Sequence, residues 1–163
     1  MFTLGIIVAS DKGSKGERLD KSGALIKEIM EKNNYSVEKY AILPDQQDLL
    51  MEELIHMSDV LKLDLVLTTG GTGFSQRDVT PEATLSVIER QTPGISEAIR
   101  YNSLQVTPRA MLSRAVSGIR KNTLIINLPG SPKAVKESLE YILPSLDHGL
   151  EILKGSASEC ARD

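Results

Sequence analysis

The stretch LVLTTGGTGFSQRDVTPEAT, Leu65–Thr84, decides the fold of this chain and holds its densest group of polar residues. It begins as an apolar run, which is typical of a strand buried on both faces of a sheet. It then passes through a glycine-rich turn and the Arg77–Asp78 pair, and it enters a helix at Thr80–Pro81–Glu82. A strand that ends in backbone amides, a cation, a carboxylate and a helix N-terminus is suited to holding phosphates and a metal ion.

Strands and helices alternate on both sides of this stretch. Short apolar runs predict strands over 3–9, 35–43, 63–69, 114–120 and 123–128, the last two joined as a hairpin. Apolar residues at helical spacing predict helices over 21–33, 50–61, 80–89, 92–101 and 131–143, and Pro144 either kinks the last helix or begins another. Residues 10–20 are expected to form a polar loop. The alternation predicts an α/β fold with three layers, α/β/α, around a mostly parallel central sheet.

The segments that follow the predicted strands are the natural place to look for a site. In parallel sheets, ligands bind beyond the carboxyl ends of the strands. We therefore expect four segments to gather at one edge of the sheet: Ser10–Gly16, Pro44–Asp48, Gly70–Asp78 and Pro129–Lys133.

Four Ser/Thr–Pro pairs each fit an N-cap hydroxyl followed by proline at the first helical position. They are Thr80–Pro81, Thr92–Pro93, Thr107–Pro108 and Ser131–Pro132. Most such pairs only begin helices. The first and the last differ because a glycine-containing loop, Gly70–Gly73 or Pro129–Gly130, comes before them. Glycine lets the backbone approach a ligand closely, and a helix N-terminus favours an anion.

Two aspartates are candidate metal ligands. Asp78 is either half of a surface ion pair, an alternative helix cap, or a carboxylate that holds a hard cation such as Mg²⁺ bridging substrate phosphates. Asp45 would by itself be a turn residue, but at a shared sheet edge it could converge with Asp78 on one metal. Asp11 and Asp20, which flank the first loop, are interpreted as loop and cap residues.

Other polar residues give weaker signals. Arg77 is suited to neutralising charge on a phosphate. The same role or a solvated surface position is open to three further cations, Arg109, Arg114 and Lys133. His56 and His148 have no companions at ligand spacing and are interpreted as surface or packing residues. The sequence has no zinc pattern, no Walker loop and no GxGxxG motif.

Composition narrows the class of protein. A chain of 163 residues with 40% hydrophobic and 25% charged residues fits one soluble domain, which we expect over 1–154, followed by a loosely ordered tail over 155–163. The net charge of -3 gives no basic footprint for nucleic acid, and no run of apolar residues is long enough to span a membrane. The single cysteine, Cys160, cannot form an internal disulfide, so a cytoplasmic location is expected.

Taken together, these motifs resemble the molybdopterin-binding family, whose fold is Rossmann-like, and in particular its adenylyltransferase group. The resemblance covers nearly the whole chain except the tail. The combination of GGTG, RDVTPEA and a later NLPGSP is far more specific than either glycine loop alone. It rests on the segments Ser10–Asp11, Gly16, Asp20–Gly23, Pro44–Asp45, Thr69–Gly73, Arg77–Ala83, Met111–Arg114 and Asn127–Pro132.

The resemblance implies an activity. Members of this group transfer AMP from ATP to the terminal phosphate of molybdopterin with Mg²⁺, release pyrophosphate, and are typically trimers. Asp45 and Asp78 match the family's two aspartates linked to metal binding and catalysis. Residues that match its substrate-binding surface are Ser10, Gly70, Gly71, Thr72, Gly73, Arg77, Thr80, Ser113, Pro129, Gly130, Ser131 and Pro132.

The resemblance leaves two other classes of function open. The chain would be a non-catalytic pterin-binding or scaffolding paralogue if its affinity for pterin did not depend on Asp45 or Asp78. It would be a generic nucleotide-binding domain if it bound ATP without any dependence on pterin. As an adenylyltransferase it is expected to take ATP and molybdopterin as substrates and to contact a molybdate-insertion protein transiently.

Overall fold

The structure, a computed structural model, describes residues 1–156. Within this range the chain forms one six-stranded sheet in the order β2-β1-β3-β6-β5-β4. The strands are β1 (Phe2–Ala9), β2 (Tyr35–Leu43), β3 (Leu65–Thr69), β4 (Arg90–Gln91), β5 (Ser117–Arg120) and β6 (Thr123–Leu128). The first four strands in that order pair in parallel, and β5 and β4 add an antiparallel edge. The predicted mostly parallel sheet is confirmed.

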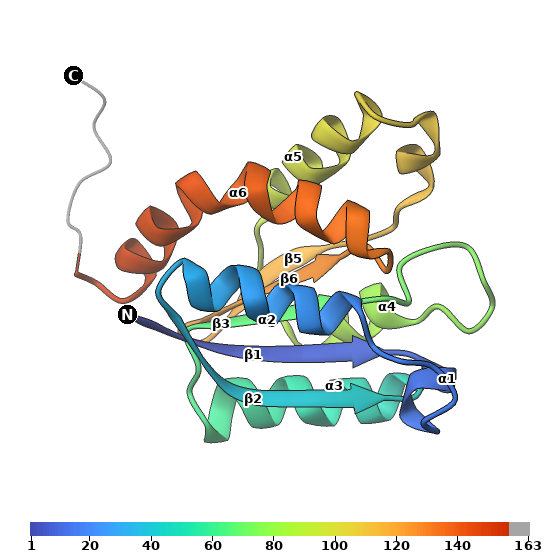
Figure 1. Cartoon of the computed structure of the whole chain (residues 1–163). Helices are drawn as coiled ribbons and strands as arrows, with labels where there is room; N and C mark the ends of the chain where they lie inside the picture. The colour runs from blue at the N-terminus through green and yellow to red at the C-terminus, as the bar shows by residue number, and fades with distance from the viewer. Residues whose placement is uncertain (157–163) are drawn as a thin grey trace.

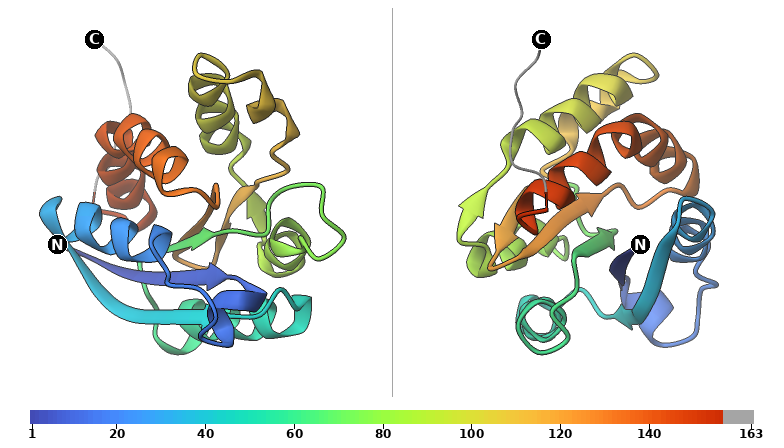
Figure 2. Two further views of the ribbon diagram at one scale, coloured as in Figure 1. Left: turned by 45° about the vertical axis from the view of Figure 1, so that its right-hand side comes forward. Right: turned by 90° about the vertical axis from the view of Figure 1, so that its left-hand side faces the viewer.

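Helices cover both faces of this sheet (Figures 1 and 2). They are α1 (Asp11–Ser14), α2 (Ser22–Lys32), α3 (Gln47–Ile55), the π-helix η1 (His56–Val60), α4 (Thr80–Val87), α5 (Pro93–Leu104), the 3-10 helix η2 (Pro108–Leu112) and α6 (Pro132–Leu153). α2, α5 and α6 pack on one face, whereas α3, η1 and α4 pack on the other. The predicted α/β/α layering is therefore confirmed.

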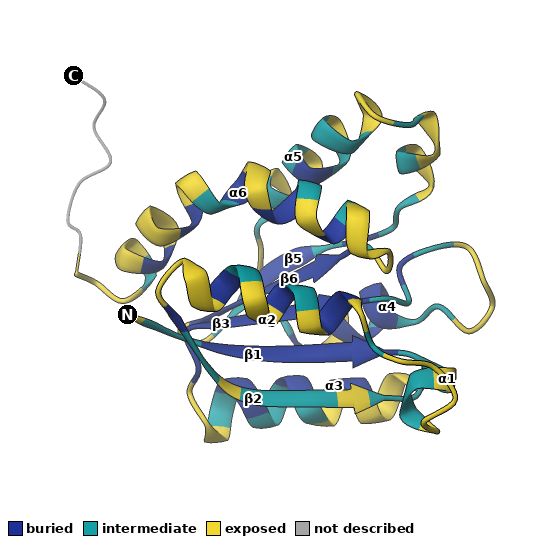
Figure 3. Cartoon of the chain, in the orientation of Figure 1, coloured by how far each residue is buried: buried dark blue, intermediate teal, exposed yellow. Residues whose placement is uncertain are grey.

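The central strand β3 shows why both faces must be covered. Successive strand side chains point to opposite faces. Leu65 and Leu67 accordingly join the core beneath α2 and α6, while Val66 joins the core beneath α3 and α4. All five residues of β3 are buried (Figure 3). The continuous apolar run in the sequence correctly predicted a strand of this kind.

The predicted hairpin between β5 and β6 is also present. Arg120 pairs with Thr123, so only Lys121 and Asn122 form the turn. Lys121 has a φ of 51°, which matches the left-handed backbone that two-residue hairpins require.

Several predicted boundaries are wrong for local physical reasons. The polar loop 10–20 contains α1, because the Ser10 hydroxyl caps it by accepting from Gly13 N at 2.9 Å. The helix predicted over 80–89 ends at Val87, where Ile88 turns to extended backbone. The next residues form β4, which pairs with β5. A two-residue strand carries no periodicity, so no local pattern predicts it.

Three other helices differ from their predicted lengths. The helix marked by residues 50–61 begins at Gln47 and changes into η1 at His56, where Leu61 N donates to His56 O in π-helical spacing. α5 continues to Leu104, beyond the predicted end at 101. α6 runs without a break through Pro144 to Leu153, so a second helix does not begin there.

Two of the four predicted N-caps are correct. The hydroxyls of Thr107 and Ser131 accept from backbone amides of the helices that follow them. Thr92 occupies an N-cap position but makes no capping bond. Thr80 is instead the first residue of α4, and its hydroxyl donates to Gly70 O at 2.9 Å. The tertiary contact with the glycine loop replaces the local cap.

No helix among residues 1–156 is long and apolar enough to cross a membrane. The loosely ordered tail expected over 155–163 lies, from residue 157 onward, outside the described residues.

One fully buried polar side chain, Asn127, joins β6, β3, α4 and the segment before β5. Its Nδ2 donates to Thr68 Oγ1 on β3 at 3.0 Å and to Thr84 Oγ1 on α4 at 2.9 Å. Its Oδ1 accepts from Val116 N, directly before β5, at 3.2 Å. Buried polar groups are favourable only when their hydrogen bonds are complete. Asn127 therefore fixes how β6, β3 and α4 meet below the sheet edge.

We expect Asn127→Ala to lower the free energy of unfolding by about 2–4 kcal/mol, because it leaves buried polar groups without a partner. Urea denaturation followed by circular dichroism measures this. Ser138→Ala is the matched control: Ser138 is also fully buried, but its Oγ has no partner. That variant should stay within about 0.5 kcal/mol of the wild type or gain stability. Equal losses in the two variants would contradict the role of the Asn127 network.

Candidate functional site

A cavity of about 670 Å³ opens where the parallel strands end. In Figure 1 the heads of β1 and β2 point toward this edge, where α1 and the loop before α4 lie. Segments from all four predicted loops meet here. The predicted site residues that line the cavity are Ser10, Asp45, Gly70, Gly71, Asp78, Gly130, Ser131 and Pro132.

The other predicted site residues do not line the cavity. They are Thr72, Gly73, Arg77, Thr80, Ser113 and Pro129. Thr80 N donates to Gly71 O at 3.1 Å, and Pro129 O accepts from the Thr69 hydroxyl at 2.6 Å. Ser113 Oγ accepts from Ala115 N at 3.3 Å, which turns the chain into β5. These contacts hold the loops rather than reach into the cavity.

Some lining residues were missed because only the part of the first loop from Ser10 to Gly16 was expected at the sheet edge. The chain from Arg18 to Ser22 lines the cavity as well, so Arg18 and Lys21 bring two cations to it. Ser22 Oγ donates to Gly130 O at 2.7 Å and joins the start of α2 to the glycine loop after β6. The motif Asp20–Gly23 pointed to this wall only through the family resemblance.

Glycine is required where the loops touch. Gly70 has a φ of +90°, and a Cβ there would lie 2.4 Å from Ala9 O. Gly71 has a φ of +67°, and its Cβ would lie 2.4 Å from Thr80 Oγ1 and 3.1 Å from Asp45 Oδ1. The end of β1 and the loops after β2 and β3 therefore approach one another at a distance that only glycine permits.

One carboxylate oxygen of Asp45 accepts a hydrogen bond and the other accepts none. Its Oδ2 accepts from Asp11 N at 3.0 Å, whereas its Oδ1 is buried without a hydrogen-bond partner. Burial raises the pKa of this carboxyl above its usual range, and the charges of Asp11 and Asp78 raise it further. A buried carboxylate oxygen without a donor costs free energy, which a bound cation would offset.

Asp78 sits on the opposite loop, where its Oδ2 accepts from Ser75 N at 3.1 Å. Among residues 1–156, no group of three or more His, Cys, Asp or Glu gathers that could hold a metal ion by itself. A divalent cation at Asp45 and Asp78 would therefore take its remaining oxygen ligands from water or from a bound phosphate. This arrangement is common for Mg²⁺, and the donors present fit it.

Arg77 pairs with Asp11 rather than with Asp78. Its Nε and Nη2 donate to the two oxygens of Asp11 at 2.9 and 2.8 Å. These bonds lower the pKa of the Asp11 carboxyl to about 2. Asp11 Oδ1 also accepts from Asp45 N at 3.0 Å, so Asp11 links two loops of the site and is more than a loop residue. The phosphate role predicted for Arg77 would require this pair to separate.

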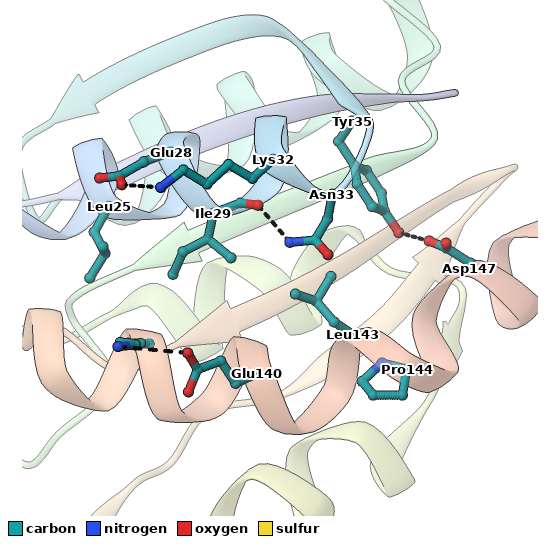
Figure 4. Close-up of a pocket in the computed structure, with 11 residues that line it drawn as sticks. Leu25, Glu28, Ile29, Lys32, Asn33, Tyr35, Glu140, Leu143, Pro144 and Asp147 are labelled. Atoms are coloured by element: carbon teal, nitrogen blue, oxygen red, sulfur yellow. Dashed lines mark hydrogen bonds and ion pairs between the residues drawn. The ribbon is translucent and has the colours of Figure 1, made fainter.

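A second cavity, of about 710 Å³, lies between α2 and α6 and contains none of the predicted site residues. Its charged residues largely pair with one another, as in Glu28 with Lys32 and Lys136 with Glu140 (Figure 4). The Tyr35 hydroxyl bonds to Asp147 across its end. This cavity lacks the open carboxylate and the glycine loops of the first one.

Comparison with known proteins places the chain in a family. Residues 5–148 match the family described as the probable molybdopterin binding domain, and the chain belongs to it. It is 43% identical over 155 residues to the molybdopterin adenylyltransferase of Helicobacter pylori (strain J99 / ATCC 700824), covering 94% of this chain and 88% of that protein. It is also 43% identical over 142 residues to the enzyme of that name from Escherichia coli (strain K12), covering 85% of this chain and 72% of the relative.

Solved structures agree with the fold. The molybdopterin biosynthesis enzyme MoaB from Thermus thermophilus superposes with a TM-score of 0.90 at 46% identity, over 95% of this chain and 98% of that chain. The tungsten cofactor synthesizing protein MoaB from Pyrococcus furiosus superposes with a TM-score of 0.83 at 37% identity, over 94% and 98% of the two chains. The family predicted from the motifs is thus confirmed.

The tight contact at Gly71 can be tested by adding one methyl group. Gly71→Ala should lower the free energy of unfolding by about 2–4 kcal/mol, because the new Cβ overlaps Thr80 and the backbone is left-handed. Gly16→Ala is the matched control: Gly16 has a φ of +73° with nothing within 4 Å of its Cβ, so only backbone strain of about 1 kcal/mol is expected. Urea denaturation of both variants measures the difference. Equal losses would mean that the contact with Thr80 is unimportant.

The raised pKa of Asp45 predicts that its charge destabilises the fold. Because the folded state takes up this proton more readily than the unfolded chain, the ionised carboxyl lowers stability at neutral pH. Asp45→Asn should therefore raise the thermal midpoint at about pH 7, and the gain should vanish below about pH 4, where the carboxyl is protonated in both states. Calorimetry from about pH 3 to about pH 8 tests it. Asp48→Asn, an exposed neighbour, should change nothing; a destabilised Asp45→Asn would contradict the argument.

Proposed function

We propose that this chain is a molybdopterin adenylyltransferase, which transfers AMP from ATP to the terminal phosphate of molybdopterin. An oxygen of that phosphate forms a bond to the α-phosphorus of ATP, the bond between the α- and β-phosphates breaks, and pyrophosphate leaves. The relatives named molybdopterin adenylyltransferase, at 43% identity over most of the chain, support this activity. The observation that carries it is the open, buried oxygen of Asp45 beside Asp78 in a cavity floored by glycine loops.

The chain's own groups suit a reaction between two phosphates. Like charges repel, so the site must hold both anions in line and offset their charge. The N-terminus of α6, capped by Ser131 and preceded by Gly130, offers backbone amides for one anion. Arg18 and Lys21 add positive charge on the wall nearest α2. No covalent intermediate with the protein is needed, so the site requires no activated nucleophile.

We propose Asp45 and Asp78 as the residues that would hold Mg²⁺ and as the catalytic carboxylates. When bound, the ion would supply positive charge against the phosphates. Asp45 remains fixed by Asp11 N, and Asp11 in turn is held by Arg77. The chain thus keeps one carboxylate oriented while leaving its second oxygen open.

The wider properties implied by the family are also proposals. We propose that residues 1–154 act as one domain, that the protein works in the cytoplasm, and that it transiently contacts a molybdate-insertion protein. We propose a homotrimer because the family resemblance implies one. Contact with another protein chain is supported by exposed apolar side chains of α5, of η2 and of the segment between them, namely Tyr101, Leu104, Val106, Met111 and Leu112. Such a group favours contact with another protein surface over contact with water.

A turnover assay with purified protein tests the activity. Wild type should convert molybdopterin, ATP and Mg²⁺ into adenylylated molybdopterin and pyrophosphate. Asp78→Asn should reduce the rate by at least about 100-fold, because it removes one charge where the reaction needs it. Asp48→Asn, an exposed residue outside the cavity, is the control and should retain the wild-type rate.

The outcomes also separate the other two classes of function. Tight pterin binding without release of pyrophosphate, unchanged by Asp45→Asn or Asp78→Asn, would identify a non-catalytic paralogue. ATP binding that is indifferent to pterin would identify a generic nucleotide-binding domain. Either result would overturn the proposal.

A further inference from the structure

Each of the three guanidinium nitrogens of Arg114 bonds to an acceptor in the protein. It lies on the segment between η2 and β5. Its Nε donates to Gly73 O at 2.7 Å, its Nη2 donates to Asp78 O at 2.8 Å, and its Nη1 pairs with the Glu82 carboxylate. Its backbone N donates to Thr72 O at 2.9 Å. The sequence made Arg114 a candidate phosphate ligand, but these bonds turn its guanidinium toward the protein.

The two carbonyls that accept from Arg114 bracket a single loop. Gly73 O and Asp78 O stand at the two ends of the segment 73–78, and Glu82 lies in the first turn of α4. A guanidinium presents its donors in one rigid plane, so it can bind two carbonyls and a carboxylate at once. Arg114 therefore closes the loop that carries Asp78 and ties it to the helix that follows.

This loop has little else to hold it. Residues 74–77 are all exposed, and the Phe74 side chain is 70% exposed. The remaining bonds of Asp78 run to Ser75, within the loop itself. The contact of Arg77 with Asp11 is an ion pair on the protein surface. Segments with few buried contacts open locally, so the loop depends on the Arg114 bonds for a fixed position.

Resting on the proposed function, we propose that Arg114 is a positioning residue, which holds the Asp78 carboxylate in the cavity opposite Asp45. It does so through the backbone of the loop and not by contact with substrate. A displacement of about 1 Å at a reacting group can cost on the order of 100-fold in rate, so such a clamp matters for turnover even at a distance from the phosphates.

The chain offers a matched control, Arg120, which makes a similar set of bonds away from the cavity. Its Nε and Nη2 donate to the two oxygens of Asp59 at 3.0 and 2.7 Å, and its Nη1 donates to Val87 O at 2.8 Å. It lies at the end of β5 and does not line the cavity. Loss of either arginine should cost stability, but only loss of Arg114 should free the Asp78 loop.

Hydrogen exchange and kinetics on the full chain test this role. Arg114→Ala should speed amide exchange in the segment 70–79, at Ser75 and Asp78 above all, by about 10-fold or more, whereas Arg120→Ala should not. The kcat of Arg114→Ala should fall by about 10- to 100-fold with little change in the KM for ATP, because binding and positioning are separate. Arg114→Lys, which cannot reach both carbonyls at once, should recover stability better than kcat.

Each result decides between positioning and a purely structural role. Unchanged exchange in 70–79, or equal loss of kcat in Arg114→Ala and Arg120→Ala, would overturn the proposal. Faster exchange with an unchanged kcat would overturn it too. If Arg114→Ala does not fold, Arg114→Lys is measured by the same two methods against Arg120→Lys. If wild type makes no adenylylated molybdopterin, the proposed function fails, and the exchange data still decide whether Arg114 holds the loop.

Discussion

The parallel pairing of β3 between β1 and β6 is the constraint on which the site depends. It brings the carboxyl ends of the three strands to one edge, and it forces the loop after β3 to cross the end of β1. That crossing leaves no room for a side chain, since a Cβ on Gly70 would lie 2.4 Å from Ala9 O. The packing of the sheet by itself therefore requires the glycines of this loop. The cavity they floor follows from the same close approach.

Around this floor, several charged side chains of the loops are already paired within the protein. Arg77 neutralises Asp11, and Arg114 is bound to Glu82 and to two carbonyls. Among the described residues that line the cavity, only Asp45 keeps a buried side-chain oxygen without a donor. An unsatisfied group of this kind costs stability and is most often kept where function needs it. Among the described residues of the cavity wall, Asp45 Oδ1 is therefore the buried side-chain oxygen that is available to a ligand.

Much of the fold followed from local patterns, and the failures have local explanations. The continuous apolar run of β3 predicted a fully buried strand, and the glycine loops predicted where chain segments approach closely. Thr80 fits a helix cap by sequence, yet its hydroxyl bonds to Gly70 O because the loop folds back on α4. Arg114 is a candidate phosphate ligand by sequence, yet its partners lie 32 to 41 residues away along the chain. Such contacts have no signature within a window of neighbouring residues.

The sequence by itself determined the layered α/β fold, most of the order of strands and helices along the chain, and the family, because hydrophobic periodicity and the GGTG, RDVTPEA and NLPGSP motifs are local properties. Only the tertiary structure decided which cation meets which carboxylate. It paired Arg77 with Asp11, assigned Arg114 to the loop, brought Arg18 and Lys21 to the cavity, and left Asp45 with an open oxygen. The reason is physical: the pairing of charges depends on distances between separate loops, and those distances exist only once the parallel strands have brought the loops together.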